Sequence, residues 1–293
     1  ILIGISCSAE LKAQKNGTVY KGNDPAVRYT GRTLVSPDGS VAFDWVGTYL
    51  ETRFTGGKLS VKVSETGTSY YNVFVDGKLH KVVKVCGTDT LIHLVSGIDK
   101  RIHSLKIQKR SEGEFGKTTV HQFVLSGSGR LAEEPAVRTR HIEFIGNSLT
   151  CGYGTDGKHR DEPFLVETEN CNLTFASMLA RYYDADYTLI AHSGRGAARN
   201  YGDSVRVSKV TMKDRMLNTF DEDLTHKWNF KEYRPDLVVI NLGSNDFSTE
   251  PHPYKSEFTK AYKQILAQLR EHYGDIPILC IYPVAMQAPV FSY

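Results

Sequence analysis

Three apolar runs of the chain end in loops that are rich in glycine and polar residues. Ser148 follows "HIEFIGN", Gly194 follows "YTLIAHS" and Asn245 follows "DLVVINLGS". A serine hydroxyl can attack an ester, and fixed N–H groups can stabilise the oxyanion that forms. Ser148 offers its hydroxyl and its own N–H, Gly194 a closely approaching main-chain N–H, and Asn245 a side-chain amide. These residue types predict acyl-transfer chemistry, provided that the three loops meet.

The elements that must position these loops have the pattern of a parallel sheet. After residue 140 the apolar runs are continuous, which is typical of strands buried on both faces. Helical periodicity lies between them, with Leu173, Ala176 and Leu179 on one predicted face and a long amphipathic segment over 255–273. This alternation predicts an α/β doubly wound domain over 141–293. The carboxyl ends of its strands would then share one edge, which brings the three loops together.

The first half of the chain has a different period. Residues 17–128 alternate between apolar and polar types, with turn signals such as Asp76-Gly77 between the runs. This pattern predicts short strands in an antiparallel β-sandwich. Residues 129–140 have no apolar period and are predicted to be a linker. A chain of 293 residues is long enough for these two domains.

The blocks "GNS", "HSGRG" and "GSND" resemble the first three blocks of the SGNH (GDSL-type) hydrolases. Longer stretches, including "GNSLTCGYG", "SGRGAARNYGD" and "GRTLVSPDGSVAFDWVGTYLETRFTG", resemble carbohydrate esterase family two. The resemblance implies that the sandwich is a jelly-roll and that the second domain is an SGNH hydrolase. It also implies a serine esterase that removes O-acetyl groups from plant-type polysaccharides or their oligosaccharides, such as xylan, mannan or glucan. Neither a metal nor a cofactor is expected.

Two departures from the family pattern concern the catalytic machinery. Asn147 stands where the wider superfamily usually has Asp, at a position that is thought to support the loop. The family also has a C-terminal DxxH, whose histidine activates the serine, and no DxxH follows the third block, "GSND", in this sequence. We therefore expect that the second domain is truncated, that the catalytic His lies beyond Tyr293, and that residues 1–293 alone are almost inactive. His192 is a weak substitute, and a packed, loop-supporting histidine is its simpler interpretation.

Several aromatic and basic side chains are candidates for substrate binding. Tyr153, Tyr201 and Trp228 could stack on a sugar ring, although core packing is an equally good interpretation of Trp228. Arg199 could contact the polysaccharide or hold its own loop. Cys151 is not favoured as the nucleophile, because no basic residue stands near it in the sequence to lower its pKa.

Composition and charge limit the partners and the location. The net charge of +3 argues against a nucleic-acid binder, and no apolar stretch is long enough for a membrane span. Residues 1–16 resemble the remnant of a signal peptide, which predicts a secreted, periplasmic or cell-surface protein. Cys7 in "GISC" is a candidate lipid anchor, with an ordinary cleaved signal as the alternative. Cys151 and Cys171 could form a disulfide or remain free thiols.

Two alternative functions remain open at the level of the sequence. One is another SGNH activity, such as a lipase or thioesterase, which would need an apolar trench for a longer acyl chain. The other is a catalytically degenerate glycan-binding protein, which the missing base would favour. Comparing acetate with octanoate esters separates the first alternative, and a downstream DxxH argues against the second.

Overall fold

The computed structural model describes residues 17–133 and 135–282, which form two compact units. The first unit contains the described parts of Ile1–Asp44, Thr48–Lys109 and Glu114–Val137. The second contains Trp45–Gly47, Arg110–Gly113 and the described part of Arg138–Tyr293. The predicted signal remnant and Cys7 lie outside the described residues. Within the described ranges no helix has the length and apolar character needed to span a membrane.

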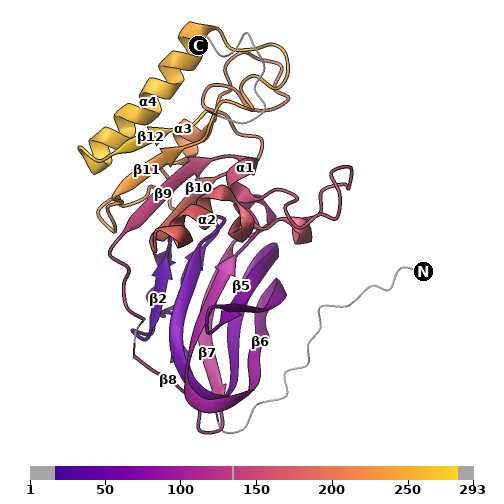
Figure 1. The fold of residues 1–293 in the computed structure, drawn as a ribbon, viewed down its shortest axis with the longest axis vertical. Helices are drawn as coiled ribbons and strands as arrows, with labels where there is room; N and C mark the ends of the chain where they lie inside the picture. Colours follow the sequence, from indigo (N-terminus) through magenta and orange to yellow (C-terminus); the bar gives the residue numbers. More distant parts are fainter. Residues whose placement is uncertain (1–16, 134, 283–293) are drawn as a thin grey trace. The chain divides into compact units, whose positions relative to one another are not determined.

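The first unit is one antiparallel sheet of eight strands (Figure 1). The strand order is β2-β5-β7-β4-β3, with β6 and β8 paired to β5 and β1 paired to β7. The strands are β1 (Gly17–Lys21), β2 (Val27–Thr30), β3 (Leu34–Val35), β4 (Val41–Phe43), β5 (Tyr49–Val75), β6 (Lys78–Lys109), β7 (Thr118–Ser126) and β8 (Arg130–Leu131).

The long hairpin of β5 and β6 replaces several of the predicted short strands. Its turn is Asp76-Gly77, and both residues have a positive φ, as the sequence predicts for a tight hairpin. The strands run on as one pair because register shifts bend them without ending them. At Gly57 a Cβ would lie 2.4 Å from the Ser126 carbonyl oxygen, so only glycine allows this close approach. The sheet curls over its own apolar core, which includes Phe54 and Phe123. The antiparallel sheet is confirmed, and the jelly-roll stays a prediction.

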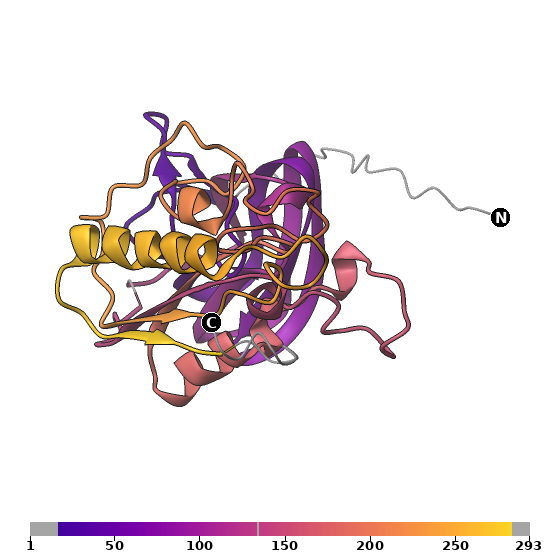
Figure 2. The same ribbon diagram turned by 90° about the horizontal axis from the view of Figure 1, so that it is seen from above.

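The second unit contains a four-stranded parallel sheet. The strand order is β10-β9-β11-β12, with β9 (His141–Gly146), β10 (Asp186–Ala191), β11 (Leu237–Ile240) and β12 (Ile278–Cys280). The helices are α1 (Ser148–Cys151), α2 (Phe175–Tyr182), α3 (Met212–Arg215) and α4 (Lys255–Tyr273), and short 3₁₀ turns occupy Gly113–Phe115, Val166–Thr168 and Cys171–Leu173. Figures 1 and 2 show α2 and α4 on opposite sides of this sheet, as in a doubly wound domain.

Each face of the parallel sheet packs on a different helix because side chains alternate along β9. Phe144 meets Phe175 of α2 edge-on, with ring centroids 6.0 Å apart. Ile145 belongs to the core cluster that contains Ile265 and Leu269 of α4. The predicted helical stripe of Leu173, Ala176 and Leu179 is partly wrong. Leu173 lies in the 3₁₀ turn before α2, and Leu173 and Leu179 are 46% and 42% exposed, whereas Ala176 is buried. The small residues Ala176, Ser177 and Ala180 are buried instead, which allows the helix to approach the sheet closely.

Candidate active site

Ser148 is the first residue of α1, directly after the end of β9. Asn147 caps the helix, and its side-chain oxygen accepts the Leu149 N–H at 3.2 Å. Gly146 is required at the end of the strand because a Cβ there would lie 2.0 Å from Thr150 Oγ1. Ser148 is half-buried, and as the first helical residue its N–H has no acceptor within the helix. The hydroxyl and the N–H of Ser148 are therefore both available to a ligand.

Gly194 lies in the turn after β10, and hydrogen bonds hold the peptide groups on both sides of it. Its φ is positive and lies in the left-handed region that favours glycine. The Gly194 carbonyl oxygen accepts the Tyr201 N–H at 2.8 Å, and the His192 carbonyl oxygen accepts the Arg195 N–H at 3.3 Å. Within the described residues no acceptor is found for the N–H of Gly194 itself. The turn therefore presents one unused main-chain donor.

Asn245 follows β11 and joins the second and third loops. Its Nδ2 donates one hydrogen bond to the Arg195 carbonyl oxygen at 2.8 Å and retains a second hydrogen. The neighbouring Ser244 Oγ accepts a hydrogen bond from Asn147 Nδ2 at 2.9 Å, which ties the third loop to the first. Since β9 lies between β10 and β11 in the parallel sheet, the loops after all three strands share one edge.

Asp246 is a buried carboxylate that organises the second loop, and sequence reasoning missed it. Its side chain accepts the N–H groups of Ala197, Ala198 and Arg199 at 3.0, 2.6 and 2.9 Å. Gly196 must be glycine here, because a Cβ would lie 2.0 Å from the Arg199 carbonyl oxygen. Burial raises the pKa of Asp246, and the three N–H bonds oppose that rise. Its position one residue after Asn245 was the only signal in the sequence.

His192 is buried in a charged network. It is 1% exposed, and its Nδ1 lies 2.6 Å from Asp221 Oδ2 and 3.5 Å from a carboxylate oxygen of Glu222. Arg215 also pairs with both carboxylates at 2.8 Å. Burial alone would lower the pKa of His192, but the charge and hydrogen bond of Asp221, followed by Glu112, raise it above the ordinary value. No hydrogen bond joins His192 to Ser148 in the described part of the chain, which favours its loop-supporting interpretation.

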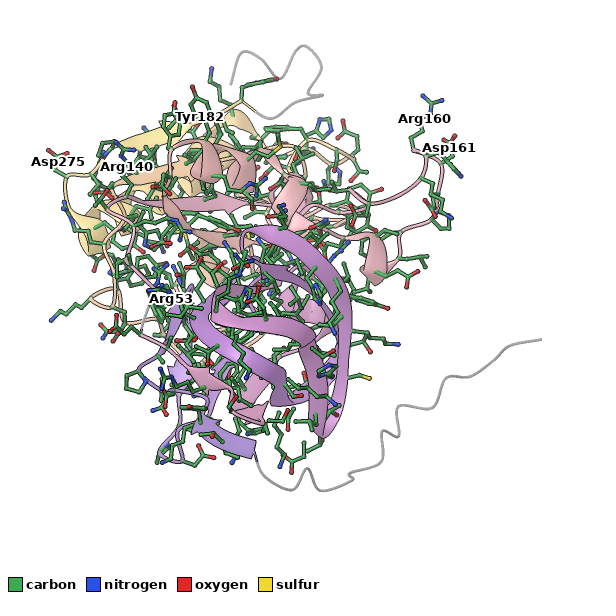
Figure 3. All side chains as sticks on the ribbon, turned by 60° about the horizontal axis from the view of Figure 1, so that its bottom comes forward. Arg53, Arg140, Arg160, Asp161, Tyr182 and Asp275 are labelled. Carbon is green, nitrogen blue, oxygen red and sulfur yellow. The ribbon has the colours of Figure 1, made fainter. Side chains whose placement is uncertain are left out.

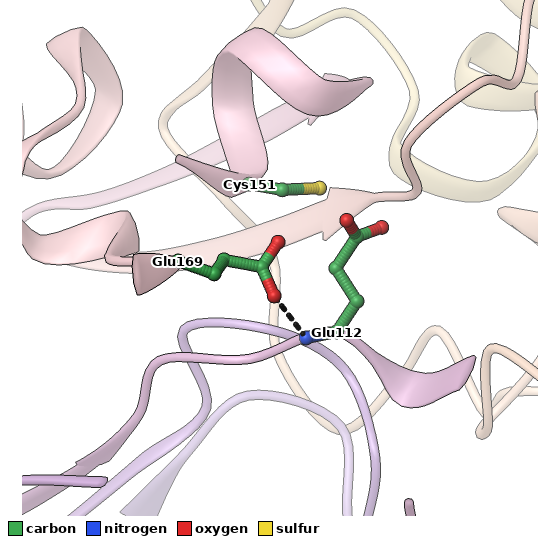
Figure 4. A group of neighbouring side chains, drawn as sticks. All are labelled: Glu112, Cys151 and Glu169. Carbon is green, nitrogen blue, oxygen red and sulfur yellow. Dashed lines mark hydrogen bonds between the residues drawn. The ribbon is translucent and has the colours of Figure 1, made fainter. Parts of the chain in front are cut away.

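Two side-chain groups in the second unit have the spacing of metal ligands. Glu112, Cys151 and Glu169 place ligand atoms within 4.8 Å of one another, as do His192, Asp221 and Glu222 (Figure 4 shows the first group). Protein donors already occupy oxygens of both groups. Asp221, for example, accepts from His192 and Arg215. These donors account for both carboxylate oxygens of Glu112 and of Asp221.

The cysteines next to the loops are not catalytic. Cys151 and Cys171 are both buried and both free thiols, so the structure has no disulfide between them. Burial, followed by the charges of Glu112 and Glu169, raises the pKa of the Cys151 thiol well above its ordinary value. A thiol that stays protonated is a poor nucleophile, which agrees with the preference for Ser148.

The four predicted substrate-binding residues divide by exposure. Tyr201 is 62% exposed, and its Cβ lies 4.0 Å from where a Gly194 Cβ would be, so this residue lies beside the turn. Tyr153 is 48% exposed and stacks on Phe164 with ring centroids 3.7 Å apart. Trp228 is 9% exposed and packs against Tyr233, as expected for a core residue.

Arg199 is fully buried, and its guanidinium group bonds to its own loop and to the loop after β11. Its partners are the Val205 carbonyl oxygen and Thr249 Oγ1, both at 3.0 Å, and the Glu250 carbonyl oxygen at 3.3 Å. The prediction that Arg199 contacts substrate is therefore not supported, because a side chain with no exposed surface cannot reach a polysaccharide. Its loop-supporting alternative fits these contacts.

The segment between α1 and α2 forms an extended loop beside Tyr153. Arg160 and Asp161 lie at its tip in Figure 3 and are 93% and 79% exposed. At its base, Arg110 forms an ion pair with Asp156 and donates from Nε to the Glu169 carbonyl oxygen at 2.6 Å. The base of the loop is thus fixed while its tip is open to solvent.

Comparisons with known proteins agree with this geometry. Residues 29–135 match the family "Carbohydrate esterase 2 N-terminal", and residues 144–293 match the "GDSL-like Lipase/Acylhydrolase family". "Cellulase/esterase CelE" of Acetivibrio thermocellus is 34% identical over 88% of this chain and 31% of its own length. An "Acetylxylan esterase / glucomannan deacetylase" of Cellvibrio japonicus is 33% identical over 75% of this chain and 61% of its own length. The chain thus spans less than two thirds of each of these relatives.

A solved structure of a family two carbohydrate esterase is similar to this chain over both units. The structure of a family two carbohydrate esterase from Clostridium thermocellum in complex with cellohexaose aligns with a TM-score of 0.85 and 33% identity. The alignment covers 90% of this chain and 79% of that one. The chain therefore belongs to the GDSL-like lipase/acylhydrolase family, within the group formed by the family two carbohydrate esterases.

Proposed function

We propose that this protein is a serine esterase that removes O-acetyl groups from polysaccharides or their oligosaccharides. The observation that carries the proposal is the set of unused donors at one edge of the parallel sheet: the N–H of Ser148, the N–H of Gly194 and the second amide hydrogen of Asn245. Donors of this kind stabilise the tetrahedral oxyanion that forms when a hydroxyl attacks an ester. The named activities of the relatives supply the acetyl group and the sugar.

In the proposed reaction, Ser148 Oγ attacks the acetyl carbonyl carbon, and the carbonyl oxygen becomes an oxyanion. The three donors bind that oxygen more strongly than they bind the neutral carbonyl, and each contributes about 2.7–4 kcal/mol in known hydrolases. Collapse of the intermediate releases the sugar hydroxyl and leaves an acetyl-serine, which water then hydrolyses to acetate. Ser148 needs a general base for its proton, and we assign none among the described residues.

The exposed aromatic rings suggest how the sugar binds. Tyr201 stands beside the Gly194 turn, and Tyr153 stacks on Phe164 at the base of the extended loop. Such rings offer flat apolar faces to the C–H faces of a pyranose. The cellohexaose in the Clostridium thermocellum structure supports an oligosaccharide as the ligand of that relative, and we extend this to the present chain. We retain Trp228 only as a core residue.

Further parts of the proposal concern fold detail and location. We propose that the curled first sheet is a jelly-roll, as the family resemblance implies. A polysaccharide cannot cross a membrane, so an enzyme for this substrate acts outside the cytoplasm, which agrees with the signal-like residues 1–16. A lipid anchor at Cys7 remains part of this proposal.

The experiment is acetate release by the complete protein from acetylated xylan and acetylated glucomannan, with 4-nitrophenyl acetate and octanoate as small substrates. We expect acetate release, a strong preference for acetate over octanoate, and loss of activity to background in Ser148→Ala. Preference for octanoate would support a lipase instead. Binding of xylo- or cello-oligosaccharides without any hydrolysis would support a degenerate glycan-binding protein.

A further inference from the structure

The carboxylate of Glu112 contacts Ser193, the residue before Gly194 in the turn after β10. It is 0% exposed and lies in the Arg110–Gly113 segment of the second unit. One carboxylate oxygen accepts the N–H of Ser193, and the other accepts the hydroxyl of Ser193. A buried carboxylate is costly unless donors compensate it, so this two-point contact accounts for much of its presence here.

These contacts determine the direction in which the Gly194 N–H points. The peptide before Ser193 is held by Glu112 and by the Arg195 N–H on the His192 carbonyl oxygen. The peptide after Gly194 is held by the Tyr201 N–H. Peptide groups are planar, so fixing the two outer peptides leaves little freedom to the one between them. That middle peptide carries the unused N–H of Gly194.

The same side chain also touches the helix that carries Ser148. Figure 4 shows Glu112 beside Cys151 and Glu169, with ligand atoms of the three within 4.8 Å of one another. Cys151 is the last residue of α1, which begins at Ser148. Glu169 Oε2 in turn accepts the Glu112 N–H at 2.9 Å and fixes the backbone that presents the carboxylate. One buried group thus lies against both the nucleophile's helix and the donor's turn.

We propose that Glu112 is a positioning residue for the oxyanion donors. It contacts no reacting atom itself; its hydrogen bonds to Ser193 hold the Gly194 N–H toward the position of the oxyanion. The proposal rests on the esterase function proposed above, because it assigns Gly194 as a donor in that reaction. It predicts an effect on kcat, since the oxyanion exists in the transition state and not in the bound ester.

The test compares four variants of the complete protein on 4-nitrophenyl acetate. Glu112→Ala removes both hydrogen bonds, Glu112→Asp keeps the charge but shortens the reach, and Glu112→Gln can keep both bonds because Ser193 can accept from the amide. Glu169→Gln is the matched control, since it changes a fully buried carboxylate of the same cluster that does not contact Ser193 and keeps an amide oxygen that can accept the Glu112 N–H.

We expect kcat to fall about 100-fold in Glu112→Ala and about 10-fold or more in Glu112→Asp, on the scale of losing one oxyanion donor. We expect KM to change by less than about threefold, and Glu112→Gln and Glu169→Gln to stay within about threefold of the unmodified kcat. Equal kcat losses in Glu112→Gln and Glu112→Ala would overturn the hydrogen-bond role. Equal kcat losses in Glu112→Asp and Glu169→Gln would overturn it as well. This second comparison remains decisive if Glu112→Ala does not fold.

A second readout separates this proposal from the proposed function. In protein labelled with ¹⁵N-glycine, the Gly194 amide resonance should shift in Glu112→Asp and remain in place in Glu169→Gln. If the unmodified protein hydrolyses no acetyl ester, the proposed function fails, and this resonance still tests the contact. An unshifted Gly194 resonance in Glu112→Asp would overturn the positioning role regardless of activity.

Discussion

Ser148, Gly194 and Asn245 could be chosen as candidate site residues from the sequence because each follows an apolar run that ends in small polar residues. That signal is local, so it survives without knowledge of the fold. The supporting residues could not be found in this way. Asp246 binds N–H groups 47–49 positions away, and Glu112 binds Ser193 across 81 positions. No spacing pattern connects such pairs, and only the folded chain brings them together.

The raised pKa of His192 predicts a pH dependence of stability. Burial lowers this pKa, but Asp221 and then Glu112 raise it above its ordinary value, against the opposing charge of Arg215. A pKa that is raised by folding gives stability that is complete below the unfolded value of about 6.5 and is lost as pH rises through the folded value. We expect the free energy of unfolding to fall over this range by about 1.4 kcal/mol per unit of the pKa rise.

The measurement is urea unfolding between pH 5.5 and 8.5 for the unmodified protein and His192→Gln, which removes the titrating group. The difference in unfolding free energy between the two should shrink as pH rises. A difference that is constant with pH would show that His192 does not titrate in this network.

At the scale of elements, periodic burial was predictable and tertiary detail was not. The period of α4 and its end at Gly274 are confirmed, because the pattern runs along the whole helix and the glycine adopts a positive φ. The predicted apolar stripe of α2 relied on leucines. In the structure, the buried residues of α2 are the small residues Ala176, Ser177 and Ala180. The union of short strands into β5 and β6 depends on bulges, for which alternation alone gives no signal.

A substitution at Gly196 would test how closely the loop after β10 is packed. A Cβ there would lie 2.0 Å from the Arg199 carbonyl oxygen and 2.4 Å from Asp246 Oδ2. Gly196→Ala should therefore displace the backbone that Asp246 holds and destabilise the protein by about 3 kcal/mol. Gly202→Ala is the comparison, because nothing lies within 4 Å of its Cβ, although its φ is positive and that of Gly196 is not. It should cost only the left-handed strain of about 1–2 kcal/mol.

Thermal unfolding and esterase activity together check this prediction. Gly196→Ala should lower both the melting temperature and kcat more than Gly202→Ala does. If the two variants lose the same stability, the loop has more space around Gly196 than its contacts indicate.

At the scale of the whole molecule, the chain crosses between its two units more often than the sequence indicated. The sequence predicts one boundary, a linker over 129–140, and that boundary stays a prediction. In the structure, Trp45–Gly47 and Arg110–Gly113 belong to the second unit although they precede it in the chain. Trp45 is 0% exposed in the core cluster of that unit. A local pattern cannot reveal such an exchange, because each segment is only a few residues long.

This exchange predicts that the second unit does not fold without the earlier segments. Residues 138–293 expressed alone lack Trp45, Arg110 and Glu112, so they should show less ordered structure by circular dichroism and faster proteolysis than the same region in the complete protein. In the complete protein, Trp45→Ala should lose about 3–5 kcal/mol, as expected for a large buried side chain. Native-like spectra from 138–293 alone would show that these segments are dispensable.

The central claim is that Ser148, Gly194 and Asn245 form one site that stabilises an oxyanion. The most direct measurement is kcat and KM of Asn245→Ala and Asn245→Asp on 4-nitrophenyl acetate, because both variants remove the amide donor and Asp preserves the shape. We expect kcat to fall about 100- to 1,000-fold in both, with KM changed by less than about threefold. An unchanged kcat in either variant would contradict the account.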